Sequence, residues 1–231
     1  MQQGKLSLTD PTTLDENNLS WKNQEKAGGV MKKLIAVSVA TIALLVGGAF
    51  SYKELSTTEK DYSVAMNQAD FILFENIEEV EKYSGYIVQA GFTGKRSLKE
   101  WNLGEGDVKA ASESEVKIQK VHKGSLKEGD TISVYEPAYF EGDVFDTVEG
   151  YNLMNEEGTY VLFLRDTGDK EGYAIIGMYQ GKYDISAGMQ NTKAKKAQPT
   201  DTYRSLEESE YFGENVEQFN KLKKEVLEKY N

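Results

Sequence analysis

The sequence predicts a mainly β domain, a small closed barrel of five or six strands, with a helical segment on either side of it. Three observations support this prediction. Between residues 70 and 186, short runs of alternating apolar residues are separated by turns that carry glycine. Residues 34–50 form an uncharged apolar run, long enough for a hydrophobic helix. Near the C-terminus, apolar residues recur at three- and four-residue steps, the pattern of an amphipathic helix.

The stretch Val116–Pro137 is the centre of the predicted barrel. It contains two apolar alternations joined by a polar connection with two glycines, so we expect a pair of strands. In the first strand, Val116 and Ile118 have one parity and Val121 has the other. This change of parity predicts a β-bulge near Gln119–Lys120.

The other elements are predicted on both sides of this pair. Asn76-x-x-Glu79 has the pattern of a capping box, which predicts a short N-terminal helix ahead of the first strand. We expect residues 94–114 to form a long polar loop. Further strands are predicted at Tyr86–Phe92, at Tyr160–Leu164 in the centre of the sheet, at Tyr173–Tyr179 and at Gly181–Ile185. This set of strands indicates an OB-like barrel, and a β-sandwich is the alternative.

The first 50 residues have the features of an exported protein. Residues 1–30 are polar and aperiodic, which indicates a disordered tail or translated sequence upstream of the true start, so the native chain begins at Met1 or at Met31. From Met31, two lysines precede the apolar run and small residues follow it, as in a signal peptide. The lysines should stay on the inner side of the cell membrane, with the C-terminal domain outside. Cleavage after Ala49 would instead release a secreted protein.

The predicted organisation therefore has six consecutive parts. They are a tail at 1–30, a signal or anchor helix at 31–50, a stalk at 51–69, the barrel domain at 70–186, a linker at 187–213 and an amphipathic helix at 214–230. The apolar stripe of the last helix either packs on the barrel or docks on a partner.

Composition excludes several classes of function. The 231 residues include no cysteine, which excludes disulfides, thiolate metal sites and cysteine nucleophiles. The net charge of -11 repels phosphate backbones, so we expect no nucleic-acid partner. The single histidine, His122, should face solvent at a strand end, and the sequence has no G-x-S-x-G element for a catalytic serine. We expect no cofactor and no metal.

Four pieces of the chain share their pattern with known domains. They are Val121–Gly124, Leu126–Val134, Gly158–Leu164 and Gly177–Tyr183. Together they resemble a group of uncharacterised exported or membrane-anchored domains of Gram-positive bacteria. Their order is also similar to the netrin-like OB barrel of tissue inhibitors of metalloproteases, which act through an N-terminal cysteine that this chain lacks. The resemblance covers about residues 70–186 and implies a fold but no activity.

Aromatic and acidic residues gather in and beside residues 136–151, and tyrosine-rich surfaces are common in binding sites. The predicted ligand-binding residues are Tyr135, Tyr139, Phe140, Asp143, Phe145 and Tyr151. We therefore expect a non-enzymatic module that binds a protein or peptide at the cell surface. An extracytoplasmic hydrolase that uses carboxylates of residues 136–149 is the alternative, and calcium binding by this loop is also open.

Overall fold

The computed structural model describes residues 60–104, 107–168, 172–186, 188 and 194–231. The chain divides into two compact units, Met1–Thr57 and Thr58–Asn231, and every described residue belongs to the second unit. The predictions for the tail, for the hydrophobic helix at 31–50 and for the first part of the stalk lie outside the described residues. Within the described residues, no helix combines the length and the apolar character needed to span a membrane.

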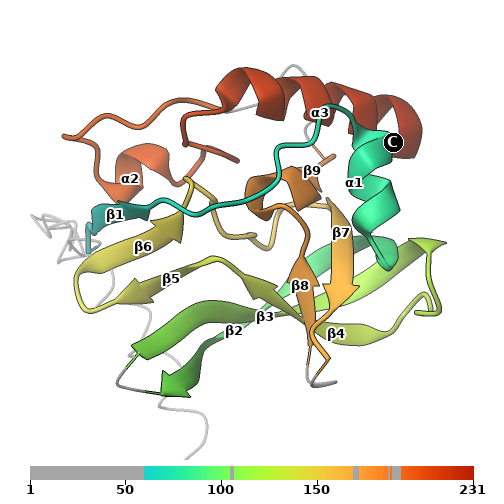
Figure 1. Cartoon of the computed structure of the whole chain (residues 1–231), viewed down its shortest axis with the longest axis horizontal. Helices are drawn as coiled ribbons and strands as arrows, with labels where there is room; N and C mark the ends of the chain where they lie inside the picture. The colour runs from blue at the N-terminus through green and yellow to red at the C-terminus, as the bar shows by residue number, and fades with distance from the viewer. Residues whose placement is uncertain (1–59, 105–106, 169–171, 187, 189–193) are drawn as a thin grey trace, which may run out of the picture. The chain divides into compact units, whose positions relative to one another are not determined.

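The structure is mainly β, as predicted, but its strands form two sheets, and the predicted single closed barrel is not found (Figure 1). The larger sheet has the order β2-β3-β4-β8-β7-β9 and the smaller one the order β1-β6-β5. The elements are β1 (Ser63–Asn67), α1 (Ile77–Tyr83), β2 (Tyr86–Gly104), β3 (Asp107–Lys123), β4 (Thr131–Glu136), β5 (Ala138–Glu141), β6 (Val144–Val148), β7 (Tyr160–Asp166), β8 (Tyr173–Ile175), η1 (Met178–Gly181), β9 (Lys182–Asp184), α2 (Tyr203–Leu206) and α3 (Val216–Tyr230).

The second sheet arises from segments that were predicted to be a stalk and a loop. Strand β1 lies in the predicted stalk and pairs in parallel with β6, while β5 and β6 form an antiparallel hairpin in the predicted acidic loop. Alternation along a strand identifies its faces but does not specify which other strand pairs with its edges. The sequence therefore could not show that these strands would pair with one another.

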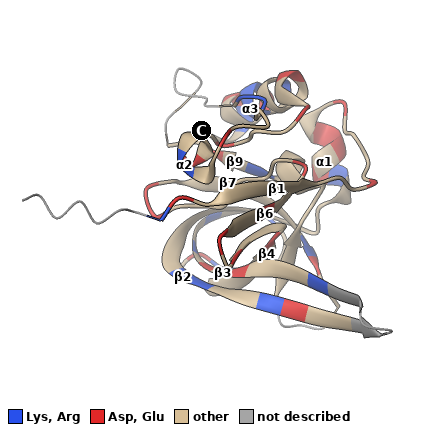
Figure 2. Cartoon of the chain, turned by 90° about the vertical axis from the view of Figure 1, so that its left-hand side faces the viewer, with Lys and Arg blue, Asp and Glu red and all other residues tan. Residues whose placement is uncertain are grey.

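The long hairpin of β2 and β3 replaces the polar loop that we predicted at residues 94–114. Its distal half is in register, with Arg96 opposite Ser114 and Trp101 opposite Lys109. This half extends beyond the neighbouring strands and carries charges of both signs (Figure 2). The buried residues of this half are Ala111, Ser112 and Ser114, which are small or polar. The apolar period-2 pattern of a half-buried strand is therefore missing from its sequence.

Two finer predictions for the larger sheet are confirmed. The register of β2 and β3 pairs Ala90 with Ile118 and Gln89 with Lys120, which leaves Gln119 as the extra residue of a bulge. Strand β7 is central, because it pairs with β2, β8 and β9, and residues 161–164 are completely buried.

The predicted strand Tyr173–Tyr179 is shorter in the structure, since Gly177 has a φ of 61° and the chain continues into η1.

Helix α1 begins where the capping pattern predicts. The Asn76 side chain accepts a hydrogen bond from the Glu79 backbone N–H at 3.0 Å. The Glu79 carboxylate accepts one from the Glu75 N–H, one residue earlier than in a standard capping box. Ile77 and Val80 are the buried residues of this helix.

The C-terminal region packs against the sheets. Helix α3 buries Phe219, Leu222 and Val226, so its stripe packs on the same domain (Figure 1). The segment predicted as a linker also contributes to the core, since Tyr211 and Phe212 are completely buried. Gly213 permits this packing, because a Cβ there would lie 2.2 Å from the Glu149 carbonyl oxygen.

Candidate functional site

The structure does not bring the six predicted ligand-binding residues into one pocket. Phe145 and Tyr151 are completely buried, and Tyr135 is 6% exposed. Tyr139 is partly buried on β5, while Phe140 and Asp143 are exposed. On β5, Tyr139 and Phe140 point to opposite faces, because successive residues of a strand do so, while Phe140 and Phe145 are cross-strand partners on one face.

Most of the aromatic residues in the predicted site are part of the core. The ring of Phe145 lies 4.8 Å from Phe140, 4.3 Å from Tyr203 and 6.3 Å from Phe212, measured between ring centroids. These rings attach the smaller sheet to α2 and to the segment before α3. Their abundance in the sequence therefore reflects packing, which composition alone cannot distinguish from binding.

Glu136 is the carboxylate of the predicted acidic loop that is completely buried, and its partners explain why. Arg96 forms an ion pair with it at 3.0 Å, and the Ser114 and Tyr151 hydroxyls donate to it at 2.5 and 2.8 Å. The Met154 backbone N–H donates to it at 2.9 Å. With all of these donors, Glu136 is part of a structural network and is not available to act on a substrate.

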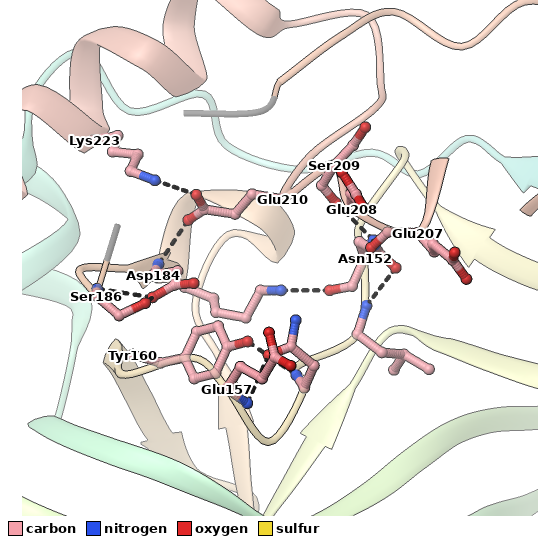
Figure 3. A pocket seen from close by; sticks show the side chains of 13 residues that line it. Asn152, Glu157, Tyr160, Asp184, Ser186, Glu207, Glu208, Ser209, Glu210 and Lys223 are labelled. Atoms are coloured by element: carbon pink, nitrogen blue, oxygen red, sulfur yellow. Dashed lines mark hydrogen bonds and ion pairs between the residues drawn. The ribbon is translucent and has the colours of Figure 1, made fainter. Parts of the chain in front are cut away.

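A polar pocket of about 500 Å³ lies elsewhere, between the loop before β7, strand β9 and the segment before α3 (Figure 3). Its volume is within the usual range of ligand sites. The lining residues are Asn152, Leu153, Asn155, Glu157, Tyr160, Lys182, Asp184, Ser186, Glu207, Glu208, Ser209, Glu210 and Lys223. None of the carboxylates of residues 136–149 is among them.

Hydrogen bonds from Asn152 hold two walls of the pocket together. Its side-chain amide donates to the carbonyl oxygens of Glu207 at 3.0 Å and Ser209 at 2.6 Å. In the loop before β7, the Tyr160 hydroxyl accepts a hydrogen bond from the Asn155 N–H at 2.9 Å. The walls are therefore fixed by buried contacts and need little rearrangement on binding.

Glu210 and Lys223 form a buried ion pair at one end of the pocket. The other oxygen of Glu210 accepts a hydrogen bond from the Asp184 N–H at 2.6 Å, so Glu210 lies between two donors (Figure 3). Burial raises the pKa of Glu210, and the Lys223 ammonium opposes this shift. Through these two contacts, Glu210 joins the middle of α3 to β9.

Lys182 is the other cation of the pocket, and it is 2% exposed. Its ammonium donates one hydrogen bond, to the carbonyl oxygen of Asn152. It also lies 4.4 Å from the ring centroid of Tyr151 and 5.5 Å from that of Tyr160, as cation–π contacts. Burial lowers the pKa of Lys182, since a charged ammonium loses its hydration there.

The remaining charged side chains in the lining are acidic. Glu157 and Glu207 are exposed, and within the described part of the chain no cation lies within ion-pair distance of either carboxylate. Asp184 accepts hydrogen bonds from the Thr159 N–H and from the N–H and hydroxyl of Ser186. The pocket therefore has an acidic rim beside a buried cation.

Sequence reasoning missed this pocket. Its residues come from three segments that polar composition alone does not connect, and we expected Gly181–Ile185 only to complete the sheet. The local sequence carried no signal, because β9 has the charged residues Lys182 and Asp184 at its two ends, a pattern that does not distinguish a buried lysine from an exposed one. Among the described residues, no group of three acidic or histidine side chains is arranged to hold a metal ion.

Comparison of the chain with protein-family models, with curated proteins and with solved structures finds no match.

Proposed function

We propose that this chain is a non-enzymatic, extracytoplasmic binding module that takes a basic segment of a protein or peptide into the pocket around Lys182. The observation that carries the proposal is the rim of the pocket, where Glu157 and Glu207 have no cationic partner among the described residues. A cationic side chain of a ligand would gain a charge-assisted contact there. Two of the rim residues, Glu207 and Glu208, follow directly on α2, so a rigid element positions them.

The location outside the cell is part of the same proposal. It is supported by the lysines and the apolar run of residues 31–50, which have the pattern of a membrane anchor with its C-terminal side outside. The acidic pocket supports a basic partner at the cell surface and disfavours nucleic acid.

We also infer that the larger sheet has an OB-like strand order, in the partly open form of that fold. Strand β2 pairs on one edge with β3 and, over Tyr86–Ala90, on the other edge with β7. Strand β4 pairs in parallel with β8, although the other pairs of this sheet are antiparallel. These pairings support the inference.

The experiment measures the affinity of the full chain, in detergent micelles, for the amidated peptide acetyl-Lys-Ala-Lys-Ala by isothermal titration calorimetry. The double variant Glu157→Gln, Glu207→Gln should bind about 2- to 30-fold more weakly, from the usual strength of partly exposed ion pairs. The acidic peptide acetyl-Glu-Ala-Glu-Ala should not bind.

A matched double variant, Glu141→Gln with Asp143→Asn, removes the same charge from the β5–β6 hairpin. It should leave the affinity unchanged. If it weakens binding and the rim variant does not, the basic segment binds at the hairpin, and the pocket assignment is wrong.

A further inference from the structure

Lys182 differs from the buried Lys223 and the partly buried Arg96 in which group balances its charge. Arg96 pairs with the carboxylate of Glu136 at 3.0 Å, and Lys223 pairs with that of Glu210. Lys182 has no carboxylate within 4.0 Å, and its hydrogen-bond acceptor is the neutral carbonyl oxygen of Asn152.

An unpaired buried ammonium is a costly arrangement. Lysine is almost never fully buried unless it is paired, because the ion loses its hydration. An ammonium has three N–H donors, and Lys182 uses one of them in a hydrogen bond to the described part of the chain. The tyrosine rings beside it attract the charge but accept no conventional hydrogen bond from it.

The position of Lys182 in the pocket explains how a ligand could accept hydrogen bonds from the two remaining N–H donors. Lys182 belongs to the lining of the 500 Å³ pocket, and the exposed carboxylates Glu157 and Glu207 belong to the same lining. One ligand can therefore meet a cation in the interior and anions at the rim. Such a ligand carries an anionic oxygen and a positive group a short distance apart.

We propose that Lys182 binds the free carboxylate of the ligand, so that the pocket recognises the C-terminal end of a basic peptide. This inference rests on the proposed function, because the rim carboxylates supply the contact to the basic side chain. The carboxylate forms charge-assisted hydrogen bonds to Lys182 and neutralises a buried charge that has no carboxylate of its own.

The chemistry gives a specific expectation for pH. Burial lowers the pKa of Lys182. The carboxylates of Glu136, Glu210 and Asp184, which lie beyond ion-pair distance, oppose this shift, and the Arg96 guanidinium adds to it. A carboxylate bound beside the ammonium raises the pKa further. At a pH where part of the Lys182 population is neutral, binding of the carboxylate takes up protons. An amidated peptide causes no such uptake.

The experiment compares acetyl-Lys-Ala-Lys-Ala with a free carboxylate against the same peptide amidated, each titrated into the full chain in micelles. The free acid should bind about 10- to 100-fold more tightly, from the usual strength of hydrogen bonds to charged groups. Lys182→Met should bring this ratio close to one. Lys117→Met removes the same charge from an exposed site on β3 and should leave the ratio unchanged.

The outcomes separate this inference from the proposed function. Equal affinity of the two peptides for the natural chain means that Lys182 does not bind a carboxylate, while the basic-peptide function stands. Binding of neither peptide overturns both. Free lysine that binds as tightly as the peptide acid overturns the assignment to a peptide end and leaves a zwitterionic amino acid as the ligand.

The comparison on the natural chain decides the question even if Lys182→Met does not fold. In that case, Lys182→Arg retains the buried positive charge and should retain a preference for the free acid. Loss of that preference in a folded Lys182→Arg variant contradicts the proposal.

Discussion

At the scale of single residues, His122 has an environment that the sequence did not predict. We expected it in solvent, but its ring packs edge-on against Tyr230 of α3, with 4.8 Å between the centroids. Its Nε2 atom is buried and has no hydrogen-bond partner. Burial and the nearby Lys120 lower the pKa of His122 below its usual 6.5. The folded state therefore favours the neutral imidazole.

The sign of the pH effect follows from this shift. A group whose pKa is depressed by folding contributes stability above its unfolded pKa, and that contribution is lost as the pH falls through the folded pKa. We predict that the chain loses stability from pH 7 to pH 5 and that His122→Phe, which keeps a ring against Tyr230, loses less. Urea denaturation at a series of pH values measures both slopes.

The control uses the fact that the chain has one histidine. Its imidazole resonances can be assigned without ambiguity and titrated directly by NMR. A measured pKa at or above 6.5 in the folded chain would contradict the prediction, because the imidazolium would then be at least as well accommodated as in water.

At the scale of elements, Glu136 is the point where several segments are joined. It lies at the end of β4, and its carboxylate binds Arg96 of β2, Ser114 of β3 and the Met154 N–H in the loop before β7. Arg96 also donates to the Met154 carbonyl oxygen at 2.6 Å. The network therefore fixes the long hairpin against the loop that leads into the central strand.

We predict that Glu136→Gln lowers the free energy of unfolding by about 3 kcal/mol, because it leaves the partly buried charge of Arg96 without a counter-ion. Urea denaturation followed by circular dichroism measures the loss. Glu115→Gln breaks the pair with Lys95, which is 75% exposed, and should cost less than about 1 kcal/mol.

The double variant Arg96→Gln with Glu136→Gln should be more stable than the sum of the two single losses implies, since no unpaired charge remains. Additive losses would show that the two side chains act independently and that the ion pair is not the source of the stability.

The same elements show how far the sequence predicts the structure. The parity of Val116, Ile118 and Val121 located the bulge, because burial of one face forces a strict period of two. The Asn76 cap located α1, since a capping bond is local. The buried positions of the distal β2–β3 ribbon hold Ala111, Ser112 and Ser114, so its sequence carried no apolar alternation and was predicted as a loop.

The candidate site was beyond sequence reasoning for a different physical reason. The environment of the Lys182 ammonium is formed by the Asn152 carbonyl, which is 30 residues away in the sequence, and by the rings of Tyr151 and Tyr160. Which distant groups surround a buried charge depends on strand pairing, and local patterns do not specify the pairing. The abundance of tyrosine indicated a binding surface, yet most of those rings fill the core.

At the scale of the whole molecule, the helix that ends the chain completes the core. Phe219, Leu222 and Val226 are almost completely buried, and the Phe219 ring stacks at 5.5 Å on Tyr183 and at 5.2 Å on Tyr211. The loss of one such side chain typically costs about 2–5 kcal/mol. The total stability of a domain is about 5–15 kcal/mol, so loss of all three should exceed what the fold can tolerate.

We therefore predict that residues 58–231 unfold in urea in one cooperative transition and that residues 58–213 have no such transition. Trp101 is the single tryptophan of both fragments, and its packing on Tyr135, at 5.0 Å between ring centroids, makes its fluorescence a probe of the sheet. The matched control is Lys224→Ala with Glu228→Ala, which changes only the exposed face of α3 and should keep the transition. A cooperative transition in residues 58–213 would instead mean that the sheets are stable by themselves. In that case α3, with its apolar stripe, would be free to leave the domain and bind a partner.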